Sequence, residues 1–358
     1  MLTQSIYWES VMMGVSLQAE NKNQIKEEIP VLDLGPFFSG EAGAAEKLAR
    51  ELCYAQENIG FYFVTNHGVP MDLIQRGYKE LERVFALPQE EKLKLRATDT
   101  RPGYVPPNSV VYVTSPINKN TKADLNEVLR YVNERSEDHP GRIAGLRFHG
   151  PNPWPENLPG FKETIKDCHE ALASLGRKML PLYALALDKP ADFFDSMFDD
   201  PLWTTRNSHY PVMEAEENQF GISPHQDHGF MTLLPLSDVP GLEIRTRAGN
   251  WINADHMGED AIIINTGEFL NRWTNGRFLA SPHRVNPPKK DRYSMALFFN
   301  PSPGTIADPL DTCVSEDNPA KFEPVSIYDY ICWYVDKNYP PSAGGKRTNI
   351  NPKSLAAE

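Results

Sequence analysis

The chain has 358 residues, of which 40% are hydrophobic, enough for a sizeable core. Its 36 Lys and Arg residues against 48 Asp and Glu give a net charge of −12, which disfavours a nucleic-acid partner bound through phosphates. No apolar run approaches the roughly 20 residues that cross a bilayer, and no basic residue precedes the apolar patch at 11–15, so neither a membrane anchor nor a secretory signal is predicted.

Hydrophobic spacing predicts helices in the first half of the chain. Residues 43–58 repeat apolar positions at helical spacing, and residues 73–85 do the same. A longer helix is predicted from Phe161 through Met179, with Pro181 expected to kink or end it. These apolar stripes are typical of core packing, so the helices are expected to support a sheet.

From about residue 203 the sequence changes to short β-rich runs separated by Gly, Pro and Asn. Such a series predicts a double-sheet jelly roll with an open mouth between the sheets. The stretch 101–122 begins with several prolines and lacks a period, which predicts a loop or short strands near that mouth. The predicted strands are 241–246, 261–265, 276–283 and 292–299.

His225 and Asp227 stand two residues apart, and a second imidazole, His283, lies downstream. In a strand, alternate side chains share a face, so His225 and Asp227 can point at one ion. Chance alone gives some His-x-Asp pairs among nine histidines, so this pair is weak evidence by itself. Two neutral imidazoles and one carboxylate nevertheless form the ligand set that suits oxygen-activating Fe(II).

A second pair at the same spacing strengthens the hypothesis. Arg292 and Ser294 follow nine residues after His283. A guanidinium group can bind a carboxylate through two parallel hydrogen bonds, and Ser294 can donate one more. The spacing therefore predicts a dicarboxylate cosubstrate that chelates the metal at one end and is held by Arg292 and Ser294 at the other.

The order His-x-Asp, His, Arg-x-Ser resembles the 2-oxoglutarate-dependent Fe(II) dioxygenases of the isopenicillin N synthase-like superfamily. The resemblance covers roughly residues 29 to 304. It implies a double-stranded β-helix core, cupin-like in its jelly-roll form, that is backed by N-terminal helices. The other motifs of the family that follow in order are Ile29–Leu34, Gly60–Pro70, Gly150–Pro155, Leu158–Phe161, Gly241–Ile244, Asn250–Ile252 and Asn265–Glu268.

The resemblance also assigns roles to single residues. The metal ligands of the family fall on His225, Asp227 and His283, and the pair that binds the cosubstrate carboxylate falls on Arg292 and Ser294. Two further histidines are expected to be no ligands: His67 is predicted to hold a turn, and His228 to be a supporting or solvated residue.

Tyr210 sits where many members of the family have a tyrosine that hydrogen-bonds the cosubstrate. One departure is visible beside it. The asparagine that is usual two places earlier is replaced by Ser208, and Asn207 lies one step off that register.

The resemblance implies Fe(II) as the metal, 2-oxoglutarate as cosubstrate, O2 as oxidant and ascorbate as a candidate reductant. The expected reaction is hydroxylation, desaturation or ring closure of a small organic substrate, with release of succinate and CO2. Because Asp227 is present, no ligand position is vacated for a halide, so halogenation is disfavoured.

Two alternatives stay open. One is an Fe(II) oxidase of isopenicillin N synthase or aminocyclopropanecarboxylate oxidase type, which uses no 2-oxoglutarate but also carries Arg-x-Ser. The other is a non-catalytic binding module, the least favoured because every metal ligand is present.

Four segments are predicted along the chain. They are a flexible tail at 1–28, an N-terminal helical and strand region at 29–155, a helix plus the jelly-roll Fe(II)/2-oxoglutarate domain at 156–304, and a C-terminal extension packing on the core at 305–358. The chain has four cysteines but no Cys-x-x-Cys pair, which predicts free thiols in a reducing compartment. A cytoplasmic setting is therefore expected, with a small-molecule substrate and neither nucleic acid nor membrane as partner.

Overall fold

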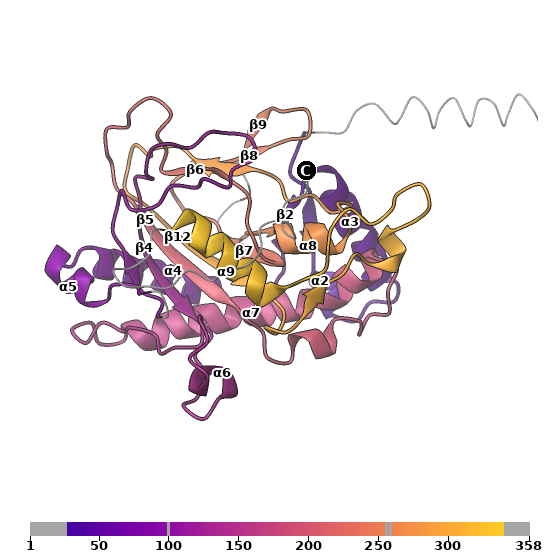
Figure 1. Cartoon of the computed structure of the whole chain (residues 1–358), viewed down its shortest axis with the longest axis horizontal. Coiled ribbons are helices and arrows are strands. Elements are labelled where there is room, and N and C mark those ends of the chain that lie inside the picture. The colour runs from indigo at the N-terminus through magenta and orange to yellow at the C-terminus, as the bar shows by residue number, and fades with distance from the viewer. Residues whose placement is uncertain (1–26, 99–100, 255–256, 258–259, 340–358) are drawn as a thin grey trace, which may run out of the picture.

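Two β-sheets form the centre of the protein (Figure 1). The structure is a computed structural model that describes residues 27–98, 101–254, 257 and 260–339, so most of the predicted tail lies outside the described residues. The order of the main sheet is β1 (Val31–Asp33), β2 (Phe61–Thr65), β10 (Ile262–Thr266), β7 (Met231–Pro235), β12 (Arg292–Phe299), β5 (Thr204–Tyr210), β4 (Glu127–Val132) and β3 (Tyr104–Val105).

The second sheet lies against the main one. Its order is β6 (Ile222–His225), β11 (His283–Val285), β8 (Leu242–Arg245) and β9 (Trp251–Asn253). Side chains of both sheets meet in one core cluster, including Phe63 of β2 and Ile244 of β8. The predicted jelly roll is therefore confirmed, as are the predicted strands that correspond to β8, β10 and β12. A short hairpin-like pair, β13 (Ile306–Ala307) with β14 (Val325–Ser326), follows.

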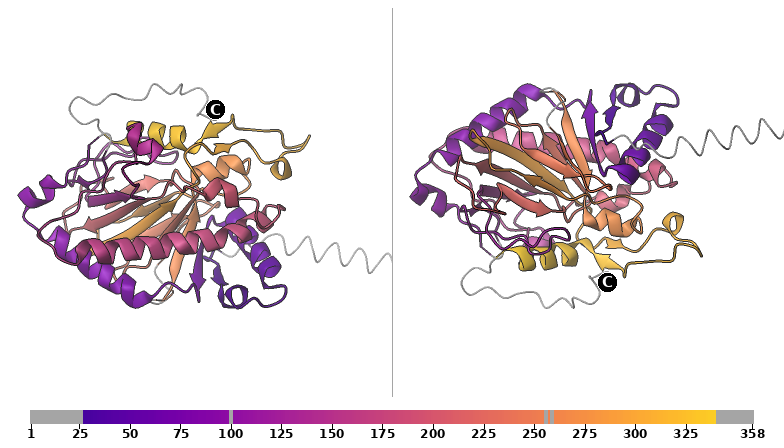
Figure 2. Two further views of the ribbon diagram at one scale, coloured as in Figure 1. Left: turned by 90° about the horizontal axis from the view of Figure 1, so that it is seen from below. Right: turned by 90° about the horizontal axis from the view of Figure 1, so that it is seen from above.

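Helices cover both sides of the sheets. Figure 2 shows the long helix α7 and the C-terminal helix α9 on opposite sides. The predicted helices at 43–58 and 73–85 are confirmed as α3 and α4, which pack on α7. None of the described helices is both long and apolar enough to cross a membrane. The bounds are α2 (Gly35–Phe38), α3 (Ala44–Asn58), α4 (Met71–Phe85), α5 (Gln89–Lys94), α6 (Pro140–Ile143), α7 (Phe161–Ala186), α8 (Glu268–Trp273) and α9 (Ile327–Asn338).

Strand β12 shows how alternation separates the helical layer from the space between the sheets. Met295 and Phe299 are fully buried in the core shared with α4 and α7. The ring of Phe299 approaches Gly176 of α7 so closely that a Cβ atom there would lie 2.9 Å from it. The alternate residues, from Arg292 to Phe298, therefore face the inside of the jelly roll.

Helix α7 begins at Phe161 as predicted and continues past Pro181 to Ala186, so of the two predicted effects of this proline, a kink or an end, the end is wrong. Proline removes one backbone hydrogen bond and crowds the preceding turn, which disfavours a helix interior. Its neighbours Leu180 and Leu182 are almost completely buried. Burial of this apolar turn against the sheet stabilises the helix where the local propensity does not.

The predicted strand at 276–283 is wrong, because β11 begins only at His283. Gly276 adopts a left-handed conformation with φ of 81°. Instead of joining a ladder, the backbone N–H of Leu279 donates to the carbonyl of Gln56 at 2.9 Å. Tertiary contacts thus replace the sheet that the apolar pattern suggested.

A buried histidine connects α7 to the main sheet. His169 is 1% exposed, and its Nε2 donates to Oδ1 of Asn207 on β5 at 3.3 Å. Burial lowers the pKa of His169 to about 4, and the Asn207 hydrogen bond only partly opposes this. The folded chain therefore holds His169 neutral at a pH at which the unfolded chain protonates it.

We expect acidification to destabilise the fold through His169. Its stabilising contribution is complete above about pH 6.5 and is lost as the pH falls toward 4, by roughly 3 kcal/mol in all. In His169→Gln, the unfolding free energy should fall less between pH 6.5 and 4 than in the wild type. Urea titrations across this range measure the difference, and equal slopes for the two proteins would contradict the assignment.

Candidate metal centre

Three buried side chains converge on one point, two from the second sheet and Asp227 from the loop that follows β6. His225 ends β6 and His283 begins β11, and the two residues are cross-strand partners. Oδ1 of Asp227 lies 3.8 Å from Nε2 of His225 and 3.7 Å from Nε2 of His283. All three candidate ligand atoms lie within 4.8 Å of one another, a separation at which one ion could contact them all.

The backbone sets the tautomer of both imidazoles. Nδ1 of His225 donates to the carbonyl of Ser223 at 2.8 Å, and Nδ1 of His283 donates to the carbonyl of Ser281 at 3.1 Å. A carbonyl can only accept, so the proton of each neutral ring is on Nδ1. The lone pair of each Nε2 therefore points toward Asp227, as a metal ligand requires.

Asp227 is oriented by two donors from the main sheet. Its Oδ2 accepts from Oγ1 of Thr232 at 2.6 Å and from Nδ2 of Asn265 at 2.8 Å. Burial would raise the pKa of Asp227, but the histidines and these hydrogen bonds hold it below its usual range. The carboxylate thus stays charged, with Oδ1 directed at the histidines.

The sequence analysis assigned no role to Thr232 or Asn265. A signal existed for Asn265, because it follows three consecutive isoleucines in a fully buried strand. A polar side chain in such a place needs a buried partner, and here the partner is Asp227.

A second group of polar side chains lies on β12 and β5. Arg292 pairs with Tyr210 across the strands, and Ser294 pairs with Ser208. Nε of Arg292 donates to the carbonyl of Val239 at 3.1 Å, whereas its buried Nη1 has no partner among the described residues. The guanidinium lies 5.0 Å from the centre of the Tyr210 ring, and Oγ of Ser208 is also unpartnered within the part of the chain that the structure describes. This group of side chains, the cosubstrate patch, therefore has unused hydrogen-bond donors that could bind a carboxylate.

The structure brings this patch close to the three convergent side chains. Tyr210 packs in one cluster with Ile222 and Val285. Ile222 begins the strand that ends at His225, and Val285 lies two residues after His283. The two groups predicted from sequence therefore share the space between the sheets.

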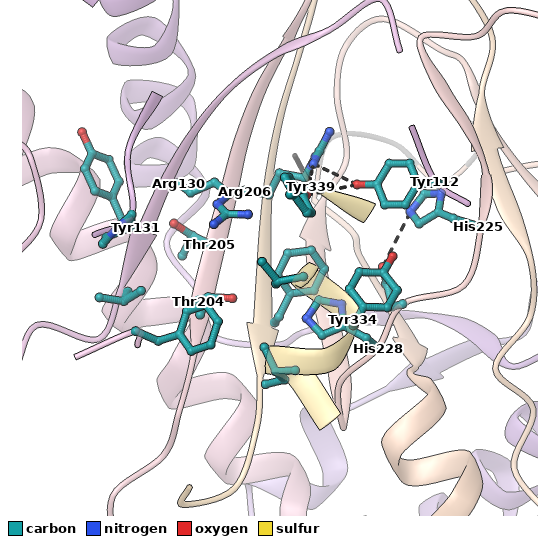
Figure 3. A pocket seen from close by; sticks show the side chains of 17 residues that line it. Tyr112, Arg130, Tyr131, Thr204, Thr205, Arg206, His225, His228, Tyr334 and Tyr339 are labelled. Atoms are coloured by element: carbon teal, nitrogen blue, oxygen red, sulfur yellow. Dashed lines mark hydrogen bonds and ion pairs between the residues drawn. The ribbon is translucent and has the colours of Figure 1, made fainter. Parts of the chain in front are cut away.

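A cavity of about 610 Å³, including open solvent at its mouth, lies beside the group of three convergent side chains, and its lining includes His225 (Figure 3). His225 and Asp227 form part of its wall, and the ring of Tyr112 stacks on His225 with 4.7 Å between centres. Tyr112 belongs to the 101–122 stretch that was expected near the mouth. Another part of the wall comes from α9, which contributes Tyr334 among others.

His67 and His228, the two histidines that were predicted not to be ligands, lie in different surroundings. Nδ1 of His67 accepts from the N–H of Val69 at 3.1 Å, which agrees with a role in holding a turn. His228 faces the cavity rather than bulk solvent, and its ring stacks on Tyr334 at 4.3 Å. Burial lowers the pKa of His228 to about 4, so the ring is neutral near pH 7. His228 is not among the three convergent ligands.

Comparisons with known proteins agree with this geometry. Residues 29–157 match the family of the non-haem dioxygenase in morphine synthesis N-terminal region, and residues 204–301 match the 2OG-Fe(II) oxygenase superfamily. The chain is 31% identical over 320 residues to the 2-oxoglutarate-Fe(II) type oxidoreductase hxnY of Emericella nidulans, which covers 87% of this chain and 90% of that protein.

Two further relatives are similar over most of their length. Kihadalactone A synthase LFS of Citrus sinensis is 34% identical over 317 residues, covering 85% of this chain and 92% of that protein. The crystal structure of a full-length Neurospora crassa protein in complex with alpha-KG and thymine is similar with a TM-score of 0.73 and 25% identity. The similarity covers 86% of this chain and 96% of that chain.

The hydrogen bond from Thr232 to Asp227 yields a prediction. Thr232→Val keeps the volume of the side chain but removes the donor on Oδ2, so the carboxylate becomes less well oriented. We expect affinity for a divalent metal to fall about 10- to 100-fold, measured by Co(II) titration. Thr246→Val is the matched control, because the Thr246 hydroxyl donates to Glu27 instead. Unchanged Co(II) affinity in Thr232→Val would refute the orienting role.

Proposed function

Because the chain belongs to the 2OG-Fe(II) oxygenase superfamily, we propose that His225, Asp227 and His283 hold Fe(II), and that Arg292 and Ser294 bind 2-oxoglutarate. The protein is a 2-oxoglutarate-dependent non-haem iron oxygenase. The observation that carries the residue assignment is the convergence of two Nε2 lone pairs and one carboxylate oxygen beside a cavity.

The donor set fits Fe(II). Two neutral imidazoles and one carboxylate occupy one face of the ion and leave the other positions for small molecules. In the neutral form of each ring, the Ser223 and Ser281 carbonyls hold the proton on Nδ1 and leave Nε2 to bind the ion. Asp227 supplies the one negative charge.

The cosubstrate patch fits one end of a dicarboxylate. Nη1 of Arg292 is buried and unpartnered among the described residues, which is costly unless a ligand accepts from it. A carboxylate of 2-oxoglutarate would satisfy this donor, with Ser294 and Tyr210 beside it. When bound, iron and 2-oxoglutarate together activate O2, with succinate and CO2 as products, and oxidise the substrate.

The substrate is proposed to be a small organic molecule in the cavity, which is hydroxylated, desaturated or cyclised. For hydroxylation, the substrate, O2 and 2-oxoglutarate give the alcohol, succinate and CO2. The aromatic side chains of the wall, such as Tyr112 and Tyr334, exclude water from the reacting centre. Four unpaired cysteines and the need for Fe(II) favour a reducing compartment such as the cytoplasm, with ascorbate as a reductant.

Removal of any proposed metal ligand should abolish turnover. His225→Ala, Asp227→Ala and His283→Ala each delete one of three donors while leaving the strands intact, so the variants should fold but lose bound iron. Succinate release and iron stoichiometry are the measurements. His139→Gln, outside the cavity, is the matched control. A variant that keeps both iron and near-wild-type activity would remove its residue from the ligand set.

The anchor for 2-oxoglutarate is tested at Arg292. Lysine keeps the charge but cannot form two parallel hydrogen bonds. Arg292→Lys should raise the 2-oxoglutarate concentration for half-maximal rate about tenfold or more, and Ser294→Ala should raise it less. Both should retain iron. Arg284→Lys is the matched control, because Arg284 pairs with Glu243 elsewhere on the second sheet.

A reaction without 2-oxoglutarate separates the enzyme classes. Wild-type protein with Fe(II), O2 and ascorbate should form no product until 2-oxoglutarate is added. Substantial product without it would instead favour an oxidase of the isopenicillin N synthase type. If 2-oxoglutarate is required but Arg292→Lys leaves its half-saturation unchanged, the enzyme class stands and the carboxylate anchor is wrong.

A further inference from the structure

Two more arginines line the cavity, at a different place from Arg292. Arg206 on β5 and Arg130 on β4 are cross-strand partners, and both contribute to the wall (Figure 3). Arg206 lies four residues before Tyr210, which corresponds to about 13 Å along a strand. The two guanidinium groups have different neighbours, because that of Arg292 lies over the Tyr210 ring and that of Arg206 donates to Tyr112 and Tyr339.

Arg206 is buried among neutral oxygens. Its Nη1 donates to the hydroxyl of Tyr112 at 2.9 Å and to that of Tyr339 at 3.0 Å, and its Nη2 donates to Oδ1 of Asn126 at 2.8 Å. Its buried Nε has no partner among the described residues. The charge of Arg206 is thus solvated by hydroxyl and amide groups but not matched by a carboxylate in contact.

Asp124 is the acidic residue that acts on Arg206, but it does not neutralise the arginine. Asp124 acts on it from beyond hydrogen-bonding distance, and Oδ1 of Asp124 already accepts two hydrogen bonds from Ser223. Burial raises the pKa of Asp124 to about 7. At neutral pH this carboxyl group is only partly charged and cannot balance the arginine.

Arg130 is also without a carboxylate partner. Its guanidinium lies 4.7 Å from the centre of the Tyr339 ring, and no carboxylate of the described residues forms an ion pair with it or with Arg206. Although burial opposes it, the two guanidinium groups hold the pKa of Tyr339 below its usual range. The local field therefore favours a negative charge at this end of the cavity.

The remaining charges of the site balance one another under the proposed function. Fe(II) brings two positive charges and 2-oxoglutarate two negative charges, while Asp227 and Arg292 contribute one of each sign. Arg130 and Arg206 are left over. Arg206 is 6% exposed, and a cation buried there without a carboxylate partner is unfavourable unless a ligand brings an anion.

Apolar side chains continue the wall from the arginines. Phe298 and Val132 come from the main sheet, and Ile331 and Val335 come from α9. Tyr112 connects the two ends of the cavity, because its hydroxyl accepts from Arg206 while its ring stacks on His225. A ligand held at Arg206 can therefore extend past one aromatic ring to the metal.

We propose that the substrate is an organic acid with an apolar body, whose carboxylate binds Arg130 and Arg206 while a C–H bond of the body faces the iron. This inference rests on the proposed function. The competing explanation is that the two arginines only hold Tyr112 and Tyr339 in place, since Arg130 also hydrogen-bonds Tyr339. Arg206 makes further contacts whose loss could disturb the fold, so Arg130 carries the test.

The test is calorimetry on the full chain loaded with Mn(II) and saturating 2-oxoglutarate without O2. Because 2-oxoglutarate then occupies Arg292, the probes cannot bind there. The probes are phenylacetate, 3-phenylpropanoate and 4-phenylbutanoate, each compared with its amide. We expect at least one acid to bind ten or more times tighter than its amide, because the charged hydrogen bonds to arginine are lost in the amide.

Variants locate the site of this preference. Arg130→Gln should reduce the preference for acid over amide about tenfold or more, and Arg130→Lys should restore part of it. The matched control Arg284→Gln should preserve the preference. Arg206→Gln should act like Arg130→Gln, and a thermal melt identifies any accompanying loss of fold.

The outcomes separate this inference from the proposed function. Binding of 2-oxoglutarate to the Mn(II) protein is measured first, and its absence would count against the proposed function itself. If 2-oxoglutarate binds but no acid does, or acid and amide bind equally, only the carboxylate site is overturned. An acid preference that persists in Arg130→Gln also overturns it.

Discussion

The antiparallel register between β5 and β12 is the constraint on which the interior depends. It places Arg292 opposite Tyr210 and Ser294 opposite Ser208, all on the inner face. A slip of one residue would turn these polar groups toward α7 and bring Met295 into the cavity. Because the helical face is apolar and tightly packed, such a slip would bury unpaired charge, so the core itself specifies the register.

The same strands explain how the interior of the jelly roll keeps three regions apart: the proposed cosubstrate site, the proposed metal site and the substrate cavity. Successive inward positions on β5 run from Tyr210 at the proposed cosubstrate end to Arg206 beside the cavity. The second sheet supplies the two proposed histidine ligands, whose rings are fixed by backbone carbonyls, and the loop after β6 supplies Asp227. Orientation at the metal thus comes from strand geometry, and few side chains are needed for it.

Much of this arrangement could be predicted from the sequence. Alternation within a strand predicted that His225 and Asp227 share a face, and the same rule paired Arg292 with Ser294. The third ligand, His283, came from the resemblance to a known family, because no local rule reveals which distant strand lies beside β6. The jelly roll and the three helices α3, α4 and α7 followed from hydrophobic period, and the structure confirms them.

Most of the residues that were not predicted act across long sequence separations. Asn265 reaches Asp227 from β10, 38 residues away, whereas Thr232 lies only five residues after Asp227, on β7. Arg130 and Arg206 become neighbours only when β4 pairs with β5. The errors were local: the apolar run at 276–283 was assigned to a strand, although tertiary hydrogen bonds hold it as coil.

Helix α9 has a consequence for how substrate preference can diverge among related chains. It lines the cavity through Tyr334 and Val335. It lies outside both large sheets and carries none of the proposed metal or cosubstrate residues. Replacement of this C-terminal segment by that of a relative would reshape the substrate wall without altering any strand register of the jelly roll. The fold thereby keeps the part of the wall that α9 supplies apart from the strands that position the proposed cosubstrate residues.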